Sequence, residues 1–93
     1  MVWIEEIKLR TALNKEQKAF QYLMNTARKM QNTKGLARAK VLAHAFLIND
    51  FSLQLVWETD AMKGPGSEEG MNLREVLKQF GLVNYDVWIE KDC

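Results

Sequence analysis

Apolar and polar residues alternate along the first part of the chain, over residues 2–11. Trp3, Glu5, Ile7 and Leu9 fall on one side of this segment, and the residues between them fall on the other. A repeat of two residues is typical of a β-strand, because successive side chains of a strand point to opposite faces. We therefore predict a strand over residues 2–11.

The next segment has the three- to four-residue spacing of an amphipathic helix. Its apolar positions are Phe20, Leu23, Met24, Ala27 and Met30. Asn14 is a good N-cap, and Gln17 stands where a capping box places its second residue. Gly35 fits the position just past the helix C-terminus, where glycine is favoured. The pattern predicts a helix that starts after Asn14.

Two strand-like runs follow, over residues 37–48 and 51–59, with Asn49 and Asp50 between them. Asn and Asp tolerate the positive φ of a tight turn, so we predict an antiparallel hairpin with a two-residue turn. This register places His44 opposite Leu55 and Leu42 opposite Trp57. One face of the hairpin is then strongly apolar, and the other face contains Val41, Ala43, Ala45, Leu47 and Val56 among polar residues.

Composition changes over residues 60–70, which hold three glycines and the only proline, and this segment predicts a loop. Ser67 is a suitable N-cap for a second helix, with Glu68 and Glu69 in the first turn, where the helix dipole favours acids. The apolar face of this helix would comprise Leu73, Val76, Leu77 and Phe80. Gly81 is expected to end it, and residues 82–91 alternate as a last strand.

The element order is strand, helix, strand, strand, helix, strand, which predicts one ferredoxin-like α+β domain over residues 1–93. In this arrangement, both helices cover the same face of a four-stranded antiparallel sheet and leave the other face bare. If four medium apolar side chains of that face became buried, the gain would be about 6–12 kcal/mol, comparable with the stability of a small domain. We therefore expect a homodimer that packs sheet to sheet.

The chain carries 13 Lys and Arg against 12 Asp and Glu, and it shows no basic stripe of the kind that binds nucleic acid or an anionic membrane surface. No apolar run is long enough to cross a bilayer. The single cysteine, Cys93, can form neither an intrachain disulfide nor, with one histidine, a zinc site, so we expect no metal. The first ten residues lack the features of a secretory signal, and we expect a cytoplasmic protein.

Three phrases resemble the dimeric α/β-barrel superfamily, which includes the antibiotic biosynthesis monooxygenases and the stress-responsive A/B barrel proteins. They are AKVLAHAFLINDFSLQLVWE, GSEEG and LKQFGLVNYDVWIE. The resemblance implies oxidation of phenols or quinols without metal or flavin, breakdown of heme, or cyclisation of polyketides. It also implies a pocket between the helices and the sheet of each subunit.

Few functional residues of this superfamily have a counterpart in the sequence. Trp57 lies roughly where the cofactor-independent monooxygenases keep a tryptophan. Those enzymes also use an asparagine, for which the chain offers only Asn49, in the predicted turn. The heme-degrading members use an asparagine in the first strand and a histidine late in the chain, and neither is present here.

His44 is the candidate catalytic residue, because histidine is the side chain that exchanges protons near neutral pH. Phe46, Leu55 and Trp57 share its predicted face and form the candidate pocket for a flat aromatic ligand. The alternative is that His44 and Trp57 only pack in the core or in a dimer interface. We expect an uncharacterised small dimeric α/β-barrel protein that binds a small hydrophobic or aromatic molecule and needs no cofactor. A cofactor-independent monooxygenase or polyketide-cyclase-like enzyme is the alternative, a purely structural or interaction dimer is a further one, and whether the protein is an enzyme is left open.

Overall fold

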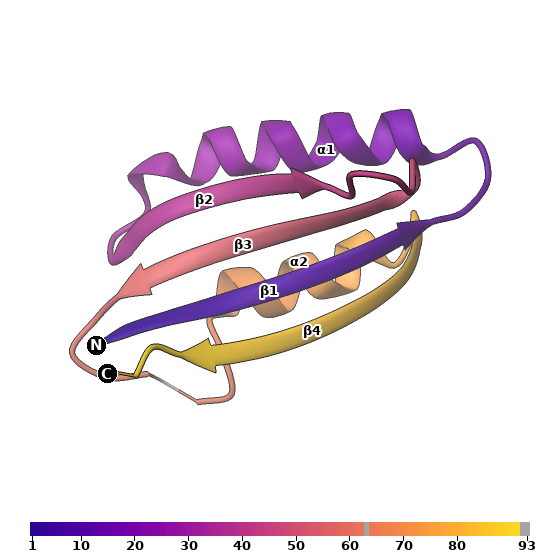
Figure 1. Ribbon diagram of the computed structural model, residues 1–93. Helices are drawn as coiled ribbons and strands as arrows, with labels where there is room; N and C mark the ends of the chain where they lie inside the picture. The colour runs from indigo at the N-terminus through magenta and orange to yellow at the C-terminus, as the bar shows by residue number, and fades with distance from the viewer. Residues whose placement is uncertain (63, 92–93) are drawn as a thin grey trace.

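The computed structural model describes residues 1–62 and 64–91, and its elements follow the predicted order. They are β1 (Val2–Thr11), α1 (Glu16–Lys29), a short 3-10 helix η1 (Met30–Asn32), β2 (Leu36–Ala43), β3 (Asp50–Glu58), α2 (Glu68–Leu77) and β4 (Gly81–Ile89). The four strands form one antiparallel sheet in the order β2-β3-β1-β4. Both helices lie on the same face of this sheet (Figure 1). The predicted ferredoxin-like α+β fold is confirmed.

The first helix begins later than predicted. Its N-cap is Lys15, which makes no side-chain capping bond, whereas Asn14 adopts a positive φ of 66° in the preceding turn. Asparagine tolerates this left-handed conformation because its short side chain bonds locally. Gly35 has a φ of +85° in the turn before β2, in keeping with its predicted place after the helix.

The predicted register of the hairpin is wrong. Leu42 pairs with Ser52 instead of Trp57, and Leu55 pairs with Ala39 instead of His44. The shift is five residues, from 57 to 52. Because side chains alternate with a period of two, an odd shift turns every residue of β2 to the opposite face of the sheet.

The physical reason for the shift is a loop over residues 44–49 in place of a two-residue turn. The backbone N–H groups of Phe46 and Leu47 donate to Nδ1 of His44, at 3.0 and 3.1 Å. The side chain of His44 therefore closes a turn directly after β2 and ends the strand at Ala43.

The core lies between the sheet and the two helices. The buried strand residues are Trp3, Ile7, Leu9, Ala39, Phe51, Leu53, Leu55 and Trp57, and the helices add Ala19, Leu23, Ala27, Leu73 and Leu77. The rings of Trp3 and Trp57, which are paired across β1 and β3, stack with centroids 5.5 Å apart. The residues of β1, β3 and α2 belong to the faces that the pattern predicts. Ala39 and Ala19 do not, and the predicted helix residues Phe20 and Met24 are exposed.

The start of α2 agrees with the prediction, but Gly81 has a different role. The Oγ atom of Ser67 accepts from the N–H of Gly70 at 2.8 Å, as expected for an N-cap. The helix ends at Leu77, and Gly81 begins β4 beside β1. A β-carbon at Gly81 would lie 2.0 Å from the carbonyl oxygen of Arg10, so this glycine permits close approach of two strands.

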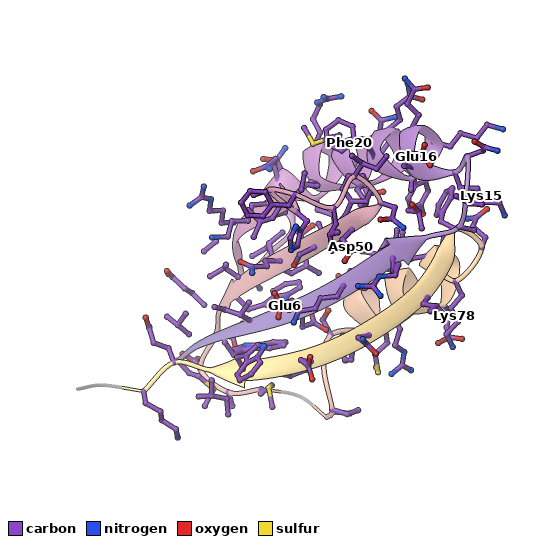
Figure 2. The ribbon with its side chains drawn as sticks, turned by 45° about the vertical axis from the view of Figure 1, so that its right-hand side comes forward. Glu6, Lys15, Glu16, Phe20, Asp50 and Lys78 are labelled. Carbon is purple, nitrogen blue, oxygen red and sulfur yellow. The ribbon has the colours of Figure 1, made fainter. Side chains whose placement is uncertain are left out.

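The second face of the sheet is free of helices and carries a mixture of apolar and charged side chains. On β2 it presents Arg38, Lys40 and Leu42, so Leu42 does not share the face of Leu55 and Trp57 as the predicted hairpin had it. Figure 2 shows Glu6 on this open face, with α2 behind the sheet. Among the described residues, no helix is both long enough and apolar enough to span a membrane.

Candidate functional site

A groove of about 510 Å³ lies on the open face of the sheet, at the end where β2 leads into the 44–49 loop. It is lined by Lys8, Leu9, Arg10, Leu42, Ala43, His44, Asp50, Phe51, Ser52, Leu82 and Asn84. The groove is therefore built from all four strands. Its volume falls in the range of small-molecule sites, about 300–1,000 Å³.

His44 stands at one wall of this groove, with its ring orientation fixed by the loop. Nδ1 accepts from two backbone N–H groups, so the neutral imidazole carries its proton on Nε2. The ring also meets Phe46 edge to face, with centroids 6.2 Å apart. The nitrogen that His44 can offer to a ligand is consequently Nε2, as a hydrogen-bond donor.

Arg10 and Asp50 form a two-pronged ion pair at the groove, with Nε and Nη2 of Arg10 each 3.0 Å from a carboxylate oxygen of Asp50. The hydrogen bond from Arg10 lowers the pKa of Asp50, and the charge of Arg10 acts in the same direction. Lys8, two residues before Arg10 on β1, also lines the groove. The groove thus combines cationic groups with the apolar side chains of Leu42 and Leu82.

The structure does not bring the four predicted site residues together. His44 lies at the groove, whereas Phe46 projects from the loop with 88% of its surface exposed. Leu55 and Trp57 are buried on the helix-covered face of β3. Trp57 is also six residues along β3 from Phe51, a separation of roughly 20 Å at 3.3 Å per residue. His44 and Trp57 therefore cannot contact one small molecule in this arrangement.

A second polar cluster, which the sequence pattern did not single out, surrounds the fully buried carboxylate of Glu5. Oε1 of Glu5 accepts from Nε1 of Trp57 at 2.7 Å and from the hydroxyl of Ser67. Oε2 accepts from the backbone N–H of Ser67 at 3.0 Å and from the hydroxyl of Tyr85. The signal was present in the alternation, because Glu5 shares the inward side of β1 with Trp3, Ile7 and Leu9.

The Glu5 cluster fills the space between the N-terminus of α2 and the sheet. A β-carbon on Gly70 would lie 2.1 Å from Oε2 of Glu5, and one on Gly66 would lie 1.9 Å from the hydroxyl oxygen of Tyr85. The negative carboxylate also sits at the positive end of the helix dipole, which favours it. Side chains thus occupy a place where the resemblance implies a pocket between helix and sheet.

Tyr85 should impose a pH dependence on stability. Burial raises its pKa, and the hydrogen bond to Glu5 and the charge of that carboxylate raise it further. The folded chain then keeps a proton that the unfolded chain releases above pH about 10, so the free energy of unfolding falls as the pH rises beyond that value. We expect Tyr85→Phe to reduce this slope, as measured in urea titrations from pH 9 to 11.5. The reduction is at most about 1.4 kcal/mol per pH unit, which is the slope that the release of one proton produces.

The matched control for this pH dependence is Tyr22→Phe, which removes a phenol that packs on Phe80, away from Glu5. Identical alkaline slopes for the unmodified chain and Tyr85→Phe would contradict the role of Glu5 in holding this proton.

Within residues 1–62 and 64–91, no group of three or more His, Cys, Asp or Glu side chains is placed to hold a metal ion. The groove and the Glu5 cluster lie on opposite faces of the sheet, and each is built from neutral groups and paired or single charges. What the groove can do chemically is hold a molecule with an apolar body and an acceptor oxygen.

Comparison with known proteins gives matches in structure only. No protein-family model matches the sequence, and no curated protein matches it. The structure of Rv0793 from Mycobacterium tuberculosis has a TM-score of 0.76 at 12% identity, over 99% of this chain and 97% of that one. A mutant form of SnoaB, a cofactor-independent oxygenase from Streptomyces nogalater, has a TM-score of 0.73 at 11% identity, over 99% of this chain and 95% of that one.

A protein from Deinococcus radiodurans with the provisional designation antibiotic biosynthesis monooxygenase has a TM-score of 0.73 at 14% identity. The match extends over all of this chain and 95% of that one. At such identities the likeness concerns the fold and not the residues of a site. The chain therefore shares its fold with these structures, as the resemblance of its sequence implied.

Proposed function

We propose that the protein is a homodimer that binds a small, flat, hydrophobic or aromatic molecule in the groove beside His44. The observation that carries this proposal is the groove of about 510 Å³, with apolar side chains from Leu42 and Leu82 and polar groups from His44 and Lys8. A phenol or quinol matches this lining. Its ring would contact the apolar residues, and its oxygen would accept from Nε2–H of His44.

The homodimer is supported by the apolar side chains that the open face leaves in solvent. Leu82, Trp88 and Leu42 are 75%, 56% and 44% exposed. Four strands at about 4.8 Å spacing and nine residues in length present roughly 600 Å² of sheet per copy. Two such faces bury about 1,200 Å² in total, which meets the lower limit for a specific interface.

The enzyme alternative is a cofactor-independent oxygenase, the activity carried in the name of SnoaB. In this alternative His44 would hold the phenol oxygen through Nε2–H, because proton uptake at Nδ1 would break both hydrogen bonds that close the loop. The assay is oxygen uptake with naphthohydroquinone. Catalysed uptake that is lost in His44→Asn would favour the enzyme over the binding protein. The lone cysteine in the sequence suits the reducing cytoplasm for either function.

Binding is tested by thermal shift with three probes, namely heme, naphthohydroquinone and dihydroxyanthraquinone. A ligand present at 100 times its Kd stabilises the folded state by about 2.7 kcal/mol. For a chain of this size that amounts to a rise in Tm of roughly 10–20 °C. We expect such a rise with at least one of the two phenolic probes. Unchanged Tm with all three probes would leave the groove as part of a purely structural interface.

His44→Asn separates ligand contact from loop structure. The Oδ1 atom of asparagine can accept from the loop N–H groups in place of Nδ1, but the donor at Nε2 is lost. We expect an unchanged Tm without ligand and about three- to tenfold weaker binding of the phenolic probe, the value of one hydrogen bond. The matched control is Asn32→Ser in η1, outside the lining of the groove, which should leave the affinity for the probe unchanged. Equal affinities of His44→Asn and the unmodified chain would contradict the contact.

A further inference from the structure

The side chains of the open face form rows that run across the strands, because the strand pairs place them side by side. The first row comprises Arg38, Val56, Ile4 and Trp88, and the second comprises Lys40, Gln54, Glu6 and Asp86. The third row comprises Leu42, Ser52, Lys8 and Asn84, and the fourth comprises Asp50, Arg10 and Leu82, with His44 beside it. The groove occupies the third and fourth rows.

Two copies that pack face to face are related by a two-fold axis that lies between the sheets. If this axis runs along the strands, each row lies over the same row of the second copy in reverse order, with β2 over β4. If it runs across the strands, the rows at one end of the sheet lie over the rows at the opposite end of the sheet of the second copy. Aligned sheet packing allows both arrangements, so the side chains must decide between them.

An axis along the strands gives complementary partners in the first and second rows. Lys40 faces Asp86 of the second copy, and the symmetry repeats this pair of opposite charges. Val56 faces Ile4, apolar against apolar. Arg38 faces the exposed ring of Trp88, a favourable pairing of a cation with an aromatic face.

An axis across the strands gives poorer partners. When it passes through the second row, Lys40 faces Lys40 and Asp86 faces Asp86, and like charges at an interface are costly. When it passes between the second and third rows, Val56 faces Asp50 and Ile4 faces Arg10. Each of those contacts places an apolar side chain over a charged one and desolvates the charge.

We propose that the two-fold axis of the homodimer runs along the strands, so that the two His44 grooves face each other and form one shared chamber. This inference rests on the proposed homodimer and deepens it, because each ligand site is incomplete without the second copy. Leu82 of one copy then closes the chamber opposite His44 of the other. A flat molecule in it would contact both copies, and the expected stoichiometry is one ligand per dimer.

The packing is tested by site-directed cross-linking of Lys40→Cys and Asp86→Cys in a Cys93→Ser background. Facing sheets lie about 10 Å apart, too far for a disulfide but within reach of a short bismaleimide. Within one chain the two positions are three strands, or roughly 14 Å, apart, which exceeds that linker. We expect covalent dimers from the chain that carries both cysteines and none from either single-cysteine chain.

Cross-linking of Lys40→Cys alone would overturn the proposal, since it places two Lys40 positions face to face. Sedimentation at the same concentrations tests the homodimer separately from the direction of its axis. A monomer would remove the homodimer itself, whereas a dimer without the expected cross-links would remove only the axis. Titration with dihydroxyanthraquinone then measures how many ligand molecules bind per dimer. Two independent sites per dimer would overturn the proposal that the copies share one chamber.

Discussion

Replacing Gly70 with alanine is expected to destabilise the protein by about 3–5 kcal/mol, even though alanine is the better helix former by about 1 kcal/mol. The added methyl group would lie 2.1 Å from Oε2 and 2.5 Å from the carboxyl carbon of Glu5. Either α2 must move away from the sheet, or the buried carboxylate must leave its four donors. Urea denaturation at neutral pH measures the change, which should also lower Tm by 12 °C or more, at about 4 °C per kcal/mol.

Gly64→Ala is the matched control for this substitution. Gly64 has a φ of +63° and nothing within 4 Å of an added β-carbon, so alanine there meets strain but no steric clash. We expect a cost of about 1–2 kcal/mol. A Gly70→Ala chain as stable as the unmodified one would mean that α2 does not rest on the Glu5 carboxylate.

Glu5→Gln should cost about 2–4 kcal/mol, although the two side chains have nearly the same shape. Each carboxylate oxygen accepts one fixed N–H, from Trp57 or from the backbone of Ser67, and one hydroxyl, from Ser67 or Tyr85. A hydroxyl can rotate to accept from the new amide group, but an N–H cannot. Whichever way the glutamine amide turns, one buried N–H loses its acceptor. Urea denaturation measures the loss.

Glu6→Gln provides the comparison for Glu5→Gln on the same strand. Glu6 lies on the open face, where its carboxylate accepts from Ser52 and Gln54 at 3.2 and 3.1 Å. Both donors are side-chain groups that can turn to accept from the new amide, so a cost below about 1 kcal/mol is expected. A double-mutant cycle of Glu5→Gln with Tyr85→Phe should show coupling above 0.5 kcal/mol, as contacting residues do. Strict additivity would show that the hydroxyl and the carboxylate act independently.

The order and type of the elements follow from the sequence because each rests on a local pattern. The alternation in residues 2–11 and the capping of α2 by Ser67 are such patterns, and both are confirmed. The hairpin register depends instead on a competition between two turns. Asn49 and Asp50 favour a two-residue turn, but the bonds from Phe46 and Leu47 to the His44 ring close a different one. Nothing in the alternation of apolar residues reveals that competition.

The candidate site was predictable only in part, for the same reason. His44 could be named because it is the only histidine, yet its neighbours depended on the register, and Phe46, Leu55 and Trp57 are not among the groove residues. Lys8 and Leu82 come from strands far from His44 in the sequence, so only the folded sheet identifies them. Glu5 could have been found by asking why a carboxylate stands among inward-facing apolar residues. Its partners Ser67 and Tyr85 required the tertiary structure.

The start of β1 and the end of β4 are paired through Trp3 and Ile89 and lie at the same end of the sheet (Figure 1). The groove is at the other end, and eight residues of strand from Val2 to Arg10 span roughly 25 Å. A fluorophore or an affinity handle attached beside either residue of the pair therefore stays clear of the groove. The protein can be tethered to a sensor chip by that end while its opposite rim remains accessible to compounds in the flow.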